Sequence, residues 1–123
     1  NLLIFYSKNL TNSWKKIKKI FPRPDLTNSR SAGRIFKYKK NYYRPSQDCS
    51  LGYGSKIVIS RILTLNKNNY SFRECFNVST DKIDENSDGI HHIDFGKNLV
   101  FFDKKKYKYT LFKLFYKLFR KLN

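Results

Sequence analysis

The stretch from Ser31 to Gly54, SAGRIFKYKKNYYRPSQDCSLGYG, constrains the fold of this chain more than any other segment. Two short runs of extended character, 33–37 and 41–44, flank a polar turn, and this arrangement predicts a β-hairpin. The proline after Arg44 has no N–H to donate and biases the residue before it toward extended backbone. We therefore expect the second strand of the hairpin to end at Arg44.

The predicted end of this hairpin places several polar side chains on one loop. Arg44, Gln47 and Asp48 would follow the strand, and the glycines on both sides of Tyr53 allow a sharp reversal of the chain. Guanidinium, amide, carboxylate and phenol groups that converge there suit a hydroxyl-rich or phosphorylated ligand. An equally physical alternative is that Arg44 and Asp48 pair with each other and only hold the corner.

The rest of the first hundred residues also has the character of β-strands. Residues 56–65 are rich in β-branched side chains, and a four-residue polar turn joins them to a partner strand, 70–78. Shorter runs at 2–6, 89–94 and 99–103 predict further strands, the last of them at an edge. An aromatic content of 17% favours a packed, β-rich core over disorder. The fold class predicted from these patterns is all-β, with antiparallel hairpins.

A series of motifs carries a resemblance to one family. The order AGRIF, YRPSQDCSLGYG, KIVISRILTL, YSFRE, GIHHID and VFFD resembles the five-bladed β-propeller domain at the N-terminus of plant glucosamine inositolphosphorylceramide transferase and of bacterial relatives. The similarity covers roughly residues 1–103. Five blades of about 40–50 residues need more chain than this. The resemblance therefore implies the last blades of a propeller, in a fragment whose start lies upstream.

The same resemblance implies a function. It predicts a carbohydrate-handling module that serves glycosyl or formyl transfer in surface polysaccharide or glycolipid biosynthesis, with a transferase domain upstream. The expected partners are a sugar, a nucleotide-sugar or a polysaccharide. An alternative is a glycosidase-like enzyme with its site in the propeller cleft. The candidate ligand-binding residues, which would line or support that cleft, are Arg34, Arg44, Gln47, Asp48, Tyr53 and His91.

Chemistry within the chain itself is weakly indicated. His91 matches a histidine of the relatives, and a buried, hydrogen-bonded histidine is the alternative interpretation. Cys49 and Cys75 have no metal-ligand spacing and could form one disulfide or remain thiols. The acidic segment around Asp84 lacks the terminal glutamate of a helix–loop–helix calcium site, which favours a solvated loop. No catalytic constellation, metal site or cofactor is predicted, and whether the chain is an enzyme stays open.

The net charge of +17 favours an anionic partner, either nucleic acid or a membrane surface. Lys, Asn, Ile, Tyr and Phe are abundant together, which also follows from an AT-rich coding sequence without any selection for charge. No signature of a nucleic-acid-binding fold is present. A basic nucleic-acid-binding protein is therefore a less favoured alternative.

The segment 104–123 has a different pattern from the rest of the chain. Its large apolar residues recur at helical spacing, with lysines and an arginine between them, which predicts a basic amphipathic helix. Lysines interrupt it too often for a membrane span. We expect it to lie on an anionic leaflet, which would make the protein cytoplasmic and peripheral at the inner face of the membrane. Docking on the missing propeller half is the alternative. The candidate membrane contacts are Leu111, Phe112, Phe115, Leu118 and Phe119.

Overall fold

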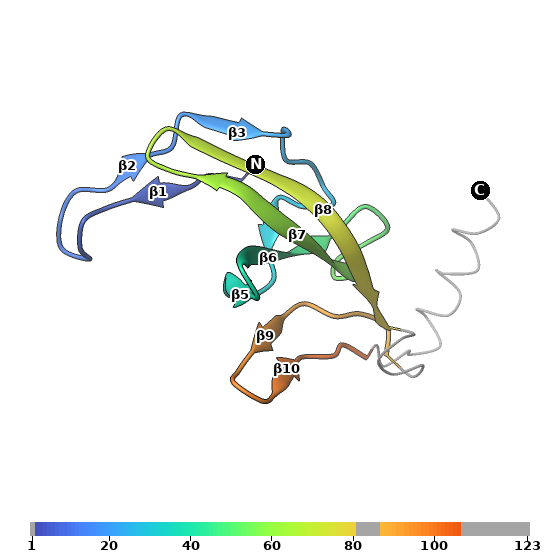
Figure 1. Cartoon of the computed structure of the whole chain (residues 1–123). Coiled ribbons are helices and arrows are strands. Elements are labelled where there is room, and N and C mark those ends of the chain that lie inside the picture. The colour runs from blue at the N-terminus through green and yellow to red at the C-terminus, as the bar shows by residue number, and fades with distance from the viewer. Residues whose placement is uncertain (1, 81–86, 107–123) are drawn as a thin grey trace, which may run out of the picture.

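The structure is a computed structural model, which describes residues 2–80 and 87–106. Those residues form β-strands and no α-helix, in agreement with the all-β prediction. The strands are short at the N-terminal end and long in the middle of the chain (Figure 1). They are β1 (Phe5–Tyr6), β2 (Lys15–Lys16), β3 (Lys19–Phe21), β4 (Arg30–Ser31), β5 (Phe36–Tyr38), β6 (Asn41–Asp48), β7 (Lys56–Leu65), β8 (Asn69–Ser79), β9 (Ile93–Phe95) and β10 (Val100–Phe102).

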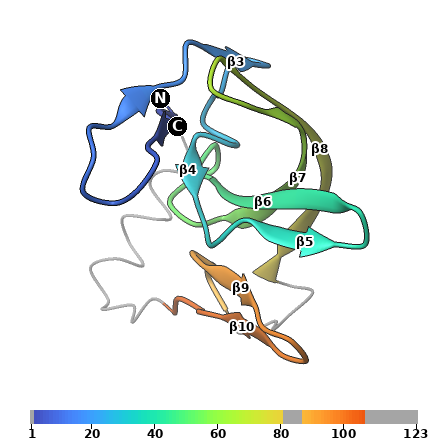
Figure 2. The same cartoon turned by 60° about the vertical axis from the view of Figure 1, so that its left-hand side comes forward.

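The main sheet has the strand order β3-β8-β7-β6-β4, and β5 also pairs with β6. The β5–β6 and β7–β8 hairpins confirm both hairpins predicted from the sequence. All the pairs are antiparallel except β3 with β8. Register shifts after Ile59 and Ile62 interrupt the β7–β8 ladder, and bulges of this kind increase local twist. The sheet is accordingly curled, as the bend of β7 and β8 in Figure 2 shows.

The prediction that the second strand ends at Arg44 was wrong. Strand β6 runs through Pro45 to Asp48 and lies between β7 and the β4 and β5 edge. The Pro45 carbonyl accepts a hydrogen bond from the Ala32 N–H at 3.1 Å. Because the nitrogen of a strand residue points to the same side as its carbonyl, the proline ring faces the gap between β4 and β5. No ladder donor is needed there, so the proline does not end the strand.

In the described part of the chain, two small two-stranded sheets accompany the main sheet, one formed by β1 and β2 and the other by the β9–β10 hairpin. The hairpin confirms the predicted strand at 99–103, which among the described residues pairs with β9 alone. The strand predicted over 89–94 begins instead at Ile93. The segments before and after the hairpin are nevertheless joined, because Gly89 and Lys105 form an isolated antiparallel β-bridge. The hairpin docks on the main sheet through the Ile93 N–H, which donates to the Ala32 carbonyl at 2.7 Å.

Strand β6 separates two different environments, because successive side chains point to opposite faces. The face that carries Tyr43, Pro45 and Gln47 packs toward the β9–β10 hairpin and is called the hairpin face. The face that carries Arg44, Ser46 and Asp48 is covered in part by the turn at 25–29 and is called the loop face. Each face has its own apolar cluster. Ala32, Ile57, Ile59, Ile90 and Ile93 form the hairpin-face cluster, and Ile17, Tyr70 and Phe72 form the other.

Two predictions fall on residues that the structure does not describe. The apolar positions of the tail, Leu111 to Phe119, lie outside the described residues, so the amphipathic helix stays a prediction. The same holds for most of the acidic segment around Asp84. The arrangement into propeller blades also remains a prediction. Within residues 2–80 and 87–106, no helix is long and apolar enough to cross a bilayer.

Candidate functional site

An exposed tyrosine and three cationic or titratable groups gather where the β6–β7 connection meets the chain before β9. Tyr53 is 47% exposed, and its ring packs at a tilt of 43° against the imidazole of His91, with ring centroids 4.5 Å apart. The Arg30 guanidinium lies 4.6 Å from the centre of the same ring, and the Lys105 ammonium lies 5.4 Å from it. The four residues are called the Tyr53 corner. Such cation–π contacts fix both the ring and the cations.

A carboxylate holds His91 in place. Asp103 accepts hydrogen bonds from the backbone N–H groups of His91 and His92 at 2.8 and 2.7 Å, and its second oxygen lies 3.5 Å from His91 Nδ1. Burial alone would raise the pKa of Asp103, but the two N–H groups and the nearby imidazoles hold the pKa below its usual value. Asp103 therefore stays ionised and orients the imidazole.

The opposite edge of the imidazole is packed tightly. Gly54 has φ +71°, and a Cβ added there would lie 2.5 Å from His91 Cδ2. The glycine thus serves both the turn and the close approach of the ring, as the sequence predicted for the turn. His91 Nε2 is buried without a hydrogen-bond partner. Gln47 Nε2 donates to the His91 carbonyl at 2.9 Å and ties this segment to β6.

Arg44 lies on the loop face, in the strand rather than on a loop. Its side chain is only 4% exposed, and it donates to the carbonyls of Asn28 and Ser29 at 2.8 and 3.2 Å. A longer contact of 3.4 Å reaches Ser31 Oγ. Burial lowers the pKa of Arg44, while the neighbouring Tyr70 opposes that change. The guanidinium thus ties the turn at 25–29 to the sheet.

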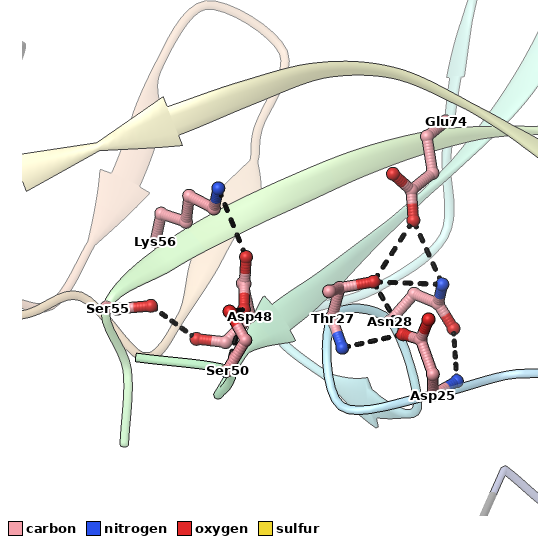
Figure 3. A network of polar contacts seen from close by, with 8 residues as sticks. All are labelled: Asp25, Thr27, Asn28, Asp48, Ser50, Ser55, Lys56 and Glu74. Atoms are coloured by element: carbon pink, nitrogen blue, oxygen red, sulfur yellow. Dashed lines mark hydrogen bonds and ion pairs between the residues drawn. The ribbon is translucent and has the colours of Figure 1, made fainter. Parts of the chain in front are cut away.

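Asp48 does not pair with Arg44, so that alternative was wrong as well. Its carboxylate contacts Lys56 Nζ at 3.2 Å and accepts from the Ser50 N–H and hydroxyl at 2.8 and 2.6 Å (Figure 3). Burial would raise the pKa of Asp48, but the hydrogen bonds from Ser50 and the charge of Lys56 hold the pKa below its usual value. The Ser55 hydroxyl closes the loop by donating to the Asp48 carbonyl at 2.7 Å.

A second polar network covers the loop face beside Arg44. Asn28 Nδ2 donates to Glu74 at 2.9 Å, and Asn28 Oδ1 accepts from the Asp25 N–H at 3.2 Å (Figure 3). Asp25 in turn accepts from the N–H and hydroxyl of Thr27, which lowers its pKa. These bonds shape the turn whose carbonyls receive Arg44.

The structure thus divides the six candidate ligand-binding residues. Gln47, Tyr53 and His91 come together at the Tyr53 corner, whereas Arg44 and Asp48 lie on the other face of β6. Arg34 is exposed and forms an ion pair with Asp94 at 3.0 Å, which lowers the pKa of that carboxylate.

Sequence reasoning missed two members of the corner and the partner of its histidine. Arg30 faces the corner because it pairs with Gln47 across β4 and β6, a register that no local pattern reveals. Lys105 and Asp103 come from the predicted tail and edge strand. The motif VFFD in the family resemblance contained the only signal, at Asp103.

The part of the chain that the structure describes contains no group of three or more His, Cys, Asp or Glu residues placed to hold a metal ion. Cys49 and Cys75 are not joined by a disulfide, and both are free thiols.

The curled sheet and the Tyr53 corner define an all-β domain with a cluster of cationic and aromatic side chains at its surface. The comparisons with known proteins place it in a family. The family model described as "Glucosamine inositolphosphorylceramide transferase 1, N-terminal" matches residues 1–100, and the chain belongs to that family. The resemblance predicted from the motifs is thereby confirmed at the level of the family.

Three plant proteins named glucosamine inositolphosphorylceramide transferase 1 are similar in sequence. The one from Arabidopsis thaliana is 35% identical over 99 residues, which cover 76% of this chain and 13% of that protein. Those from Oryza sativa subspecies japonica and indica are each 35% identical over 71 residues, or 56% of this chain and 10% of those proteins. The chain therefore spans only a small part of these relatives. No solved structure gives a significant match.

Proposed function

We propose that this domain is a carbohydrate-handling module associated with glycosyl or formyl transfer in the biosynthesis of a glycolipid or surface polysaccharide. The observation that carries the proposal is membership of a family named for the N-terminal region of a glycosyltransferase. The relatives' names describe a glucosamine inositolphosphorylceramide transferase. The chain corresponds to 13% of the Arabidopsis relative, so the role proposed here is recognition, in support of a transferase domain.

The Tyr53 corner is the proposed ligand site. An exposed phenol offers an apolar ring face and a hydroxyl, which together suit a sugar that has both C–H faces and hydroxyl groups. Arg30 contributes a guanidinium with the planar donor geometry that matches a phosphate. A nucleotide-sugar combines these two features and is the ligand that the corner fits best.

The six candidate residues divide into two roles in this proposal. Tyr53 and His91 contact the ligand, and Gln47 positions His91 through its carbonyl. Arg34 extends the cationic surface beside Asp94. Arg44 and Asp48 support the site from the opposite face of β6, because they hold the 25–29 turn and the 48–56 loop.

The proposal keeps two wider elements of the family resemblance. The curled sheet and its hairpins would form the last blades of a five-bladed propeller, and 104–123 would hold the domain to an anionic cytoplasmic leaflet.

The alternative of a glycosidase-like site needs two free carboxylates about 5–10 Å apart. Asp48, Asp94 and Asp103 instead contact Lys56, Arg34 and His91 respectively.

The test is a titration of the full chain with UDP-N-acetylglucosamine, in which calorimetry measures the binding affinity. Tyr53→Ala removes the aromatic surface and should weaken binding about tenfold, and Arg30→Ala should weaken it by a similar factor. Tyr42→Ala is the matched control, because Tyr42 is also an exposed tyrosine (51%) with a cation, Lys37, over its ring at 5.8 Å.

The outcomes separate recognition from general charge. Loss of affinity in Tyr53→Ala, with Tyr42→Ala unchanged and both variants folded, supports the corner as the ligand site. Equal affinity in all the variants, or binding that UMP reproduces fully without the sugar, would contradict carbohydrate recognition here.

A further inference from the structure

The loop face contains a buried positive charge that its surroundings do not neutralise. Arg44 is 4% exposed, and no described carboxylate lies within ion-pair distance of its guanidinium. Its hydrogen-bond acceptors are two backbone carbonyls and the Ser31 hydroxyl, which are all neutral. Buried charges in proteins are normally paired, because removing an ion from water without a counterion is costly.

A second buried polar group lies beside it without a well-formed bond. Tyr70 is 1% exposed, and its hydroxyl makes no hydrogen bond of good geometry with any described residue. Burial raises the pKa of Tyr70, and the positive charge of Arg44 and its polar contact with the hydroxyl oppose that rise. The hydroxyl is therefore a neutral donor close to a cation. This pair of groups is suited to an oxyanion, which accepts from both.

Both residues line one pocket of about 560 Å³, a volume within the usual range of ligand sites, roughly 300–1,000 Å³. Most of its wall is apolar and comes from the N-terminal segment, including Leu2 and Ile4. Among the described residues that line it, Lys67 is the other charged one, and none is acidic. The pocket therefore combines an apolar wall with positive charge and one buried hydroxyl that has no well-formed hydrogen bond.

We propose that this pocket binds an oxyanion, a phosphate or a carboxylate, that is carried on an apolar body. The anion would lie against the Arg44 guanidinium and the Tyr70 hydroxyl, and the apolar part would contact Leu2 and Ile4. The site is separate from the Tyr53 corner, because the two lie on opposite faces of β6. The proposal does not depend on the proposed function.

The experiment titrates the full chain with hexyl phosphate, hexanoate, inorganic phosphate and hexanol, with tyrosine fluorescence and calorimetry as readouts. Hexyl phosphate or hexanoate should bind more tightly than hexanol, which lacks the charge, and than inorganic phosphate, which lacks the chain. Vesicles of phosphatidylcholine with and without phosphatidic acid distinguish a lipid source of the anion from a soluble one, and binding of either supports the site.

Tyr70→Phe is the decisive variant, since it keeps the buried ring and removes only the hydroxyl. It should weaken binding of the alkyl anion about tenfold, the cost of losing one hydrogen bond to a charged group, without loss of stability. Tyr42→Phe is the control on an exposed tyrosine. Equal affinities in wild type, Tyr70→Phe and Tyr42→Phe would show that the surface lysines bind the anion and would overturn the proposal. Equal binding of hexanol and hexyl phosphate would overturn it too.

Discussion

Both faces of β6 are buried from Arg44 to Asp48, but they are stabilised in different ways. On the hairpin face, Ile57 and Ile59 are fully buried in an apolar cluster that the β9–β10 hairpin completes. On the loop face, Ser46, Asp48 and Ser60 are buried to at least the same degree as most core residues, at 0%, 2% and 0% exposure. The hairpin face gains its stability mainly from apolar area removed from water, whereas the loop face adds hydrogen bonds and an ion pair to its own apolar cluster.

The two faces should therefore respond differently to mutation and to pH. Apolar burial depends on shape and is insensitive to pH, whereas a buried polar network loses stability when any one partner is removed or protonated. The hairpin face should therefore be broken by added or deleted volume. The loop face should be broken by changes of charge and of hydrogen bonding.

The largest effect should come from Gly33→Ala. Gly33 has φ +154°, and a Cβ there would collide with the Ile93 carbonyl, next to the bond that docks the β9–β10 hairpin. Strain and displacement of the hairpin together should cost roughly 4 kcal/mol or more in the free energy of unfolding. Urea denaturation measures this value.

Gly52→Ala separates the two contributions to that cost. Gly52 also has a positive φ, +133°, but nothing lies within 4 Å of an added Cβ. Its substitution should show the backbone strain alone, about 1–3 kcal/mol. A Gly33→Ala loss no larger than that of Gly52→Ala would contradict the packing of the hairpin against this glycine.

The next largest effect should follow from Ile59→Ala on the hairpin face. The side chain is fully buried, and truncating a buried isoleucine costs about 2–5 kcal/mol. The loss should be the same at pH 4 and pH 7, because the cluster around Ile59 is apolar. Leu63→Ala, on the same strand but 49% exposed, is the control and should change stability by less than about 1 kcal/mol.

Asp48→Asn should cost less and should depend on pH. The pKa of Asp48 is lower in the folded chain than the value near 3.9 of an unfolded aspartate, so the unfolded state takes up the proton first as pH falls. The stabilisation from Asp48, about 1–3 kcal/mol, is therefore complete above pH 5 and is lost as pH falls through about 4 and below.

The measurement compares urea denaturation of wild type and Asp48→Asn across that range. The difference between the two free energies of unfolding should be largest at neutral pH and should shrink toward pH 3. Asp94→Asn, at a carboxylate whose partner Arg34 is 73% exposed, gives the baseline for a solvent-screened pair. A difference that stays constant with pH would mean that the Asp48–Lys56 pair contributes nothing.

Local patterns were sufficient for the two long hairpins, but not for the short strands β2, β3 and β4 or for the side of the sheet on which each polar residue lies. β-Branched content and turn residues predicted the β5–β6 and β7–β8 hairpins, because both form between neighbours in sequence. Whether Pro45 ends a strand depends on which strands pair with β6 on either side of it, and here it lies opposite the gap between β4 and β5. This arrangement is set by tertiary structure and not by local sequence. The burial of Arg44 and its separation from Tyr53 were therefore not predicted.

Only the part of the candidate site that is formed by neighbours in sequence could be predicted. Tyr53 and Gly54 are adjacent, and the turn they form was read correctly from the glycines. His91 was placed in the site by the family resemblance alone. Arg30 and Lys105 reach the corner from 23 residues before and 52 residues after Tyr53, through strand registers that no local rule contains.

The smallest effects come from two serines on the loop face, and they should have opposite signs. Ser46 and Ser60 are both 0% exposed, but Ser46 Oγ donates to the Val58 carbonyl at 3.2 Å whereas Ser60 Oγ has no partner. Ser46→Ala removes a satisfied hydrogen bond and should cost about 1 kcal/mol. Ser60→Ala removes a buried hydroxyl that is already unsatisfied, so it should be neutral or stabilising by up to about 1 kcal/mol.

Because the two substitutions delete the same atom at equal burial, the difference between their melting temperatures isolates the hydrogen bond itself. Equal losses in both variants would mean that the loop face is stabilised by packing, like the hairpin face, and the contrast between the two faces would fail.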